Sequence, residues 1–184
     1  MLEKLRMALL RRSLRQILAT HSRQRKTHTI ESARTIGILF DATEEKDRKE
    51  VLSLVRSLEE ERKKKVRLLG FVDSKQPLGQ TQFPQFTQKE MRWNGIPASE
   101  AVDAFVDEKV DLLLCINKLQ VLPVLWVAIA SKASMKIGTT TSVPHDFDMV
   151  LETPAEKGIR FFVDQLDLYL KKIIPSKHEP ASAL

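Results

Sequence analysis

Short apolar runs alternate with longer amphipathic segments from residue 35 onward. The apolar runs contain β-branched residues and little polar alternation, which is typical of strands buried on both faces of a parallel sheet. The expected strands are 35–40, 66–73, 110–117, 134–139 and 147–152. The segments between and after them carry apolar residues at helical spacing. The expected helices are 44–65, 98–108, 121–132 and 155–172.

This alternation predicts an α/β fold built on a single doubly wound, Rossmann-like sheet. We expect five mostly parallel strands, with helices on both faces of the sheet. Numbered along the chain, the strands are expected in the order 3-2-1-4-5 or a variant of it.

A different pattern precedes this body. Residues 1–20 contain no Gly or Pro and are rich in strong helix formers. At 100° per residue, the apolar side chains share one face: Met7, Leu10, Leu14, Ile17 and Leu18. The basic side chains fall on or near another face: Lys4, Arg11, Arg12 and Arg15. We therefore expect a basic amphipathic helix and linker over 1–33, the α/β domain over 34–174, and a flexible tail over 175–184.

The charge of the chain is concentrated in the N-terminal arm. The net charge is +6, yet residues 1–34 hold nine basic and two acidic residues, and the other 150 residues are close to neutral. A local basic excess indicates a polyanionic partner for the arm rather than for the body. We expect phosphate contacts, to ribosomal or other structured RNA, from seven residues: Lys4, Arg11, Arg12, Arg15, Arg23, Arg25 and Lys26.

Other interpretations of the arm remain open. Its apolar face can pack on the protein's own body or on a second copy, which would give a homodimer. The helix can also lie on an anionic membrane surface. The arm has no aromatic residue, and this weakens both base stacking and firm anchoring at a membrane interface.

Polar side chains gather where the expected parallel strands end, the edge at which open α/β sheets bind ligands. The candidate ligand-binding residues are Asp41, Asn117, Thr139, Thr140, Thr141 and Ser142. The chain lacks a GxGxxG turn, a GxxxxGK[ST] loop and a GxSxG elbow. We therefore predict no catalytic residue, metal or cofactor. A non-enzymatic adaptor is the leading hypothesis, and a small-molecule sensor or enzyme acting at this edge is the alternative.

Two further features bear on location and partners. Cys115 is the single cysteine and lies in an apolar run, so we expect a buried, inert thiol in a reducing cytoplasm. The connection over 74–97 is longer than an ordinary strand–helix loop and contains Phe83, Phe86 and Trp93. These aromatic residues either pin the loop to the body or form a lid or partner-binding surface.

Several motifs resemble those of a known family in their order along the chain. They are TIGILFD, FTQKEMRWNGIP, DLLLCIN, LPVLWVAIASKASMKIG and DFDMVLE. Over nearly its whole length the chain resembles an uncharacterised family of small cytoplasmic proteins common in the Bacteroidota, and the resemblance implies no chemistry. The SKASMKIG strand and the helix before it also resemble the first half of heptosyltransferase-like glycosyltransferases. The second half, which holds the sugar nucleotide in those proteins, has no counterpart in this sequence.

Overall fold

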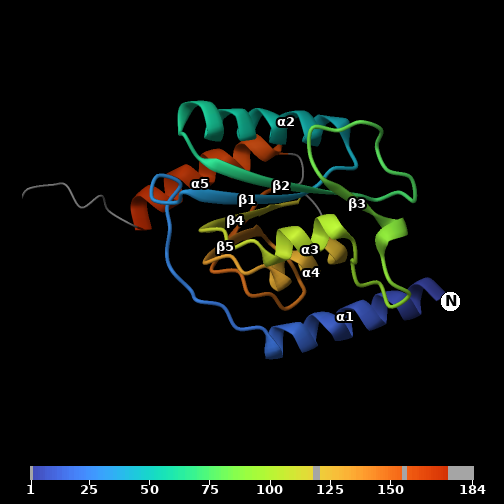
Figure 1. Cartoon of the computed structure of the whole chain (residues 1–184). Helices are drawn as coiled ribbons and strands as arrows, with labels where there is room; N and C mark the ends of the chain where they lie inside the picture. The colour runs from blue at the N-terminus through green and yellow to red at the C-terminus, as the bar shows by residue number, and fades with distance from the viewer. Residues whose placement is uncertain (1, 118–120, 155–156, 174–184) are drawn as a thin grey trace, which may run out of the picture.

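A computed structural model describes residues 2–117, 121–154 and 157–173. Among them the helices are α1 (Leu2–Thr20), α2 (Glu45–Arg56), α3 (Glu100–Asp107), α4 (Leu122–Ala130) and α5 (Ile159–Ile173). The strands are β1 (Thr35–Asp41), β2 (Lys65–Val72), β3 (Gln85–Thr87), β4 (Leu112–Ile116), β5 (Met135–Thr139) and β6 (Met149–Leu151). The predicted tail, 175–184, lies outside the described residues. The predicted α/β class is confirmed (Figure 1).

The sheet has six strands, in the order β3-β2-β1-β4-β5-β6, and all of its ladders are parallel. Both the expected count of five and the expected order are wrong. The predicted order puts the strand over 110–117 at the edge beside 66–73, whereas β4 pairs with β1, for example Ile38 with Leu114. The edge beside β2 is taken by β3, where Phe86 pairs with Phe71. The chain then crosses through α3 to the other side of β1.

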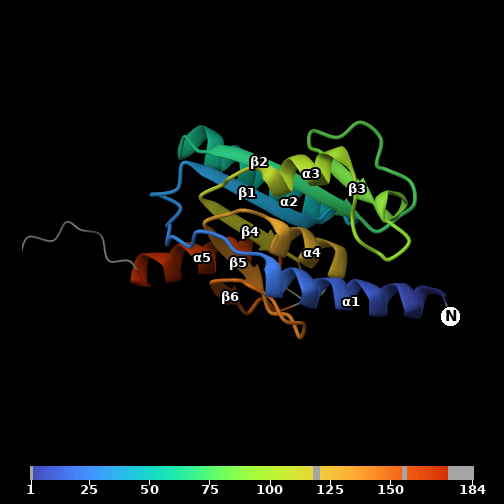
Figure 2. The ribbon, with the colours of Figure 1, turned by 60° about the horizontal axis from the view of Figure 1, so that its bottom comes forward.

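Helices cover both faces of the sheet. Helices α2 and α5 pack on one face, around buried residues such as Val51 and Phe162. Helices α3 and α4 pack on the other, around Phe105 and Val127. Helix α1 lies outside α4 and forms an additional layer on that side (Figures 1 and 2). The apolar composition of α4 is explained by this position, because α4 is sandwiched between the sheet and α1.

The helix expected over 44–65 ends earlier than its charge pattern indicates. The α-helical part, α2, ends at Arg56. The chain then forms a π-helical turn over Ser57–Glu61. Lys63 has a backbone φ of 54°, in the left-handed region, and β2 begins two residues later. A left-handed residue terminates a helix by turning the chain out of its axis. The lysines at 63–65 therefore lie after the end of the helix and not in its last turn.

Two of the three aromatic residues in the long connection pin it to the body. The Phe86 ring is fully buried, with its centroid 5.0 Å from that of Phe71. The Phe83 ring packs edge-on against Phe40, with 5.4 Å between centroids. Trp93 behaves differently, since 80% of its surface is exposed. The pinning interpretation therefore accounts for the phenylalanines and leaves Trp93 unexplained.

Candidate nucleic-acid interface

Helix α1 is docked on the protein's own body through its apolar face. Leu10 and Leu14 are each 1% exposed and form a cluster with side chains of α4, Leu125 and Ile129 among them. The contact also has a polar component, because Trp126 Nε1 donates a hydrogen bond of 3.0 Å to Ser13 Oγ. A second copy of the chain or a bilayer would have to displace α4 to reach the same side chains.

This docking leaves four of the five basic residues of α1 facing solvent. We call Lys4, Arg11, Arg12 and Arg15 together the basic face of α1, and all four are exposed. Within the described parts of the chain, none of their side chains forms an ion pair or a hydrogen bond. Four unneutralised cations on one side of one helix create a local positive potential.

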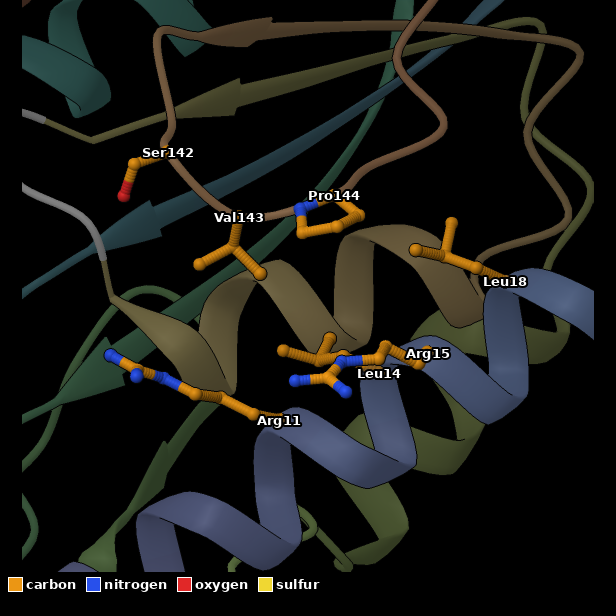
Figure 3. Close-up of a pocket in the computed structure, with 7 residues that line it drawn as sticks. All are labelled: Arg11, Leu14, Arg15, Leu18, Ser142, Val143 and Pro144. Atoms are coloured by element: carbon orange, nitrogen blue, oxygen red, sulfur yellow. The ribbon is translucent and has the colours of Figure 1, made fainter.

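Two hollows lie along the basic face. The larger, about 620 Å³, is lined by Lys4, Met7, Ala8, Arg11 and Arg15. The smaller, about 220 Å³, lies between α1 and the loop before β6, and is lined by Arg11, Leu14, Arg15, Leu18, Ser142, Val143 and Pro144. Figure 3 shows the Arg11 and Arg15 side chains extending from successive turns of α1 beside that loop. No carboxylate of the described residues lines either hollow, so an anion entering them meets only positive charge.

The two arginines carry the donor groups that proteins use to bind phosphate. Residues four apart on a helix are neighbours, with roughly 5–6 Å between their Cβ atoms. Each guanidinium presents a rigid fork of N–H donors that can bind two oxygens of one phosphate. Ser142 brings a residue of the facing loop to the same hollow. This serine is one of the ligand residues predicted at the sheet edge, and the structure places it with the arginines instead.

Arg23 belongs to a different environment from the basic face. Its side chain is only 3% exposed and donates to the carbonyls of Ala133 and Ser134, at 3.3 and 2.7 Å. It also pairs with Asp146, at 3.3 Å, and with Asp148, at 2.6 Å. These contacts occupy the donors that a phosphate would need. Arg23 therefore fastens the segment after α1 to the body in this structure.

The other two basic residues of that segment stay accessible. Arg25 is exposed and contacts Asp148 across 3.5 Å. Lys26 is exposed, while its backbone N–H donates to the Ser134 carbonyl at 3.1 Å. The expected linker is thus held, from Arg23 to Lys26, by the residues that precede β5 and β6.

A buried lysine completes this ion cluster. Lys136 on β5 has no exposed side-chain surface, and its Nζ donates to the Ile129 carbonyl at 2.8 Å and to Asp146 Oδ2 at 2.7 Å. Burial lowers the pKa of Lys136 to about 8, although the charge of Asp146 acts in the opposite direction. The lysine is therefore mainly protonated at neutral pH. Sequence reasoning missed it, and the signal was a lysine inside an otherwise apolar strand.

The predicted residues at the carboxyl edge of the sheet are mostly engaged within the protein. Asp41 Oδ1 accepts hydrogen bonds from the backbone N–H and the hydroxyl of Thr43, at 3.0 and 2.6 Å. The Thr43 hydroxyl in turn accepts from the backbone N–H of Asp73, at 2.9 Å. Asp41 therefore stabilises the turn after β1, and it does not line the cavity near β4 and β5.

The structure brings Asn117 together with Thr139, Thr140 and Thr141. They line a cavity of about 20 Å³, together with Phe147 and with Leu125 of α4. That volume holds about one water molecule. Asn117 Nδ2 donates to the Cys115 sulfur at 3.3 Å. Within the described residues the cavity is too small for a metabolite.

Cys115 is buried in the middle of the fold, as the sequence predicts. Desolvation raises the pKa of its thiol to about 12. The thiol is therefore protonated at physiological pH and is not a nucleophile in the folded protein.

The fold and its exposed basic helix define an α/β protein with an electropositive N-terminal layer. A family model described as a family of unknown function (DUF6913) matches residues 6–173. The chain belongs to this family, which confirms the resemblance to an uncharacterised family. No curated protein and no solved structure matches the chain. None of the helices in the described part is long and apolar enough to cross a bilayer.

Proposed function

We propose that this protein is a non-enzymatic binding protein whose basic face of α1 contacts a polyanion, and that the polyanion is structured RNA, with ribosomal RNA as the leading case. One observation carries the proposal. The apolar side of α1 is covered by α4, while the four residues of its basic face remain exposed and unpaired among the described residues. Contacts of this kind release counterions from a phosphate backbone and provide affinity without base specificity.

The docked helix favours RNA over a membrane surface as the partner. An interfacial helix binds a bilayer by inserting its apolar face below the headgroups. In α1 that face is packed on Leu122, Leu125 and Ile129. The side available to a partner is the cationic one, which suits a phosphate backbone. A cytoplasmic location is part of the proposal, because it puts the protein in the same compartment as ribosomal RNA.

The proposal predicts a loss of RNA affinity when the basic face is neutralised. The basic-face variant changes four residues of α1 to glutamine: Lys4, Arg11, Arg12 and Arg15. We expect its affinity for a structured RNA to fall at least tenfold at about 0.1 M salt, since about four phosphate contacts are lost. Because these side chains are exposed and unpaired among the described residues, the fold should be preserved. Fluorescence anisotropy with a labelled RNA hairpin measures the change.

A matched control separates local contacts from net charge. The control variant changes four basic residues on α2 and α5, across the sheet from α1, to glutamine: Lys46, Lys49, Arg56 and Arg160 (Figure 1). Its net charge equals that of the basic-face variant, yet it should bind RNA nearly as well as the wild type. Equal affinities for all three proteins would refute the proposal. Binding of the wild type to anionic vesicles, but not to RNA, would assign the face to a membrane instead.

A further inference from the structure

Trp93 stands at the tip of a tightly held turn. The Arg92 N–H donates to the Ile96 carbonyl at 2.9 Å, and the Gly95 N–H donates back to the Arg92 carbonyl at 2.8 Å. Gly95 has a φ of 81°, a conformation that glycine adopts without strain. The indole is 80% exposed although the backbone beneath it is fixed. A large aromatic side chain presented to solvent on a held turn is typical of a recognition residue.

The turn that carries Trp93 is packed against α1. A Cβ at Gly95 would lie 3.3 Å from Arg6 Cγ and 3.3 Å from Leu10 Cβ, so the two backbones approach closely here. Ile96 joins the apolar cluster between α1 and α4. Folding therefore supplies beside α1 the aromatic residue that the arm itself lacks.

Trp93 lines a groove that leads away from the basic face. The groove has a volume of about 720 Å³, within the range of pockets that hold small ligands, and runs between the N-terminal half of α1 and the ends of β2 and β3. Its lining includes Met7, which also lines the larger hollow of the basic face. A chain whose phosphates follow the basic face can therefore pass over Met7 and reach Trp93.

The charges around the groove favour an anionic occupant. Arg6 and Lys75 line it, and the Nε of Arg6 is buried without a hydrogen-bond partner among the described residues. The one carboxylate that the described residues contribute to the lining, Asp73, already accepts a hydrogen bond from Gln88 Nε2. A ligand with both a flat apolar ring and a phosphate would satisfy the indole and the cations together.

We propose that Trp93 is a stacking platform for an unpaired base, so that the RNA bound by this protein is recognised in a single-stranded segment adjoining the basic face. This inference rests on the proposed function. Bases in a duplex are already stacked on their neighbours, whereas those of loops and single strands are free to stack on an aromatic side chain. The basic face holds the backbone, and Trp93 distinguishes an unpaired strand from a duplex.

The test compares two probes and two variants of the full chain. The probes are a single-stranded RNA without internal pairing and a fully paired RNA duplex of the same length. We expect Trp93→Ala to weaken binding of the single strand roughly 5- to 150-fold, the cost of losing one stacked base, and to leave duplex affinity unchanged. Trp93→Tyr should restore most of the single-strand affinity because a phenol ring still stacks. Indole fluorescence should be quenched by the single strand and lose that response in Trp93→Ala.

The possible results separate this inference from the proposed function. If Trp93→Ala binds the single strand as tightly as the wild type, Trp93 serves another class of partner, such as a protein, and the inference is overturned. An equal loss of affinity for both probes in Trp93→Ala also overturns it, because losing a stacking contact with an unpaired base cannot weaken binding of a fully paired duplex. The RNA proposal itself fails on different results: the basic-face variant retains full affinity for both probes, or the wild type binds neither probe.

Discussion

Replacing Asp146 by alanine is expected to lower the free energy of unfolding by about 3–5 kcal/mol, because the change breaks a buried ion pair. Asp146 Oδ2 lies 2.7 Å from Lys136 Nζ, and the lysine side chain has no exposed surface. Without the carboxylate, the ammonium group keeps only the Ile129 carbonyl as an acceptor among the described residues. A buried cation that loses its ion-pair partner is strongly disfavoured. Urea denaturation followed by circular dichroism measures the loss.

An exposed ion pair of similar length provides the control for Asp146. Asp107 accepts from Lys132 Nζ at 2.6 Å, but 70% of the Asp107 side chain is exposed. Asp107→Ala should therefore cost less than about 1 kcal/mol. Adding Lys136→Met to Asp146→Ala should recover part of the lost stability, since the unpaired buried cation is then removed. Similar losses for the two aspartates would contradict the assignment of Asp146 to a buried ion cluster.

The second large effect is expected at the contact between α1 and α4. Leu14 is 1% exposed and packs in the cluster that joins the two helices. Truncating it to alanine leaves a cavity and should lower the free energy of unfolding by about 2–4 kcal/mol. Chemical denaturation of the full chain provides the measurement.

Leu5 on the same helix is the matched control, because 57% of its surface is exposed. Leu5→Ala should change stability by less than about 0.5 kcal/mol. The difference between the two variants reports the docking of α1. If Leu14→Ala were as mild as Leu5→Ala, α1 would not be docked, and its apolar face would be open to a second copy or a membrane.

The fold class could be read from the sequence because buried parallel strands are uniformly apolar and their crossover helices are amphipathic. The strand order could not be read in the same way. The order depends on β3, a three-residue strand whose pattern, Gln85–Phe86–Thr87, is too short to distinguish from a loop. Without β3, nothing in the pattern explains why the chain crosses from the β2 edge to the far side of β1.

The basic face of α1 was visible in the sequence because helical periodicity alone separates Lys4 and Arg11 from Leu10 and Leu14. The different environment of Arg23 was not visible, since it depends on Asp146 and Asp148, which lie 123 and 125 residues further along the chain. Charge counts treat every arginine alike, whereas partners distant in sequence decide which ones face solvent. For the same reason, no local pattern placed Trp93 beside α1.

The most direct test of the central claim, that the basic face of α1 binds a phosphate backbone, is the salt dependence of RNA binding. The logarithm of the association constant falls linearly with the logarithm of salt concentration, by roughly 0.7 per phosphate neutralised on a single strand. With four contacts removed, the slope of the basic-face variant should be shallower than that of the wild type by about 3, while the control variant on α2 and α5 keeps the wild-type slope. Identical slopes for the wild type and the basic-face variant would contradict the claim.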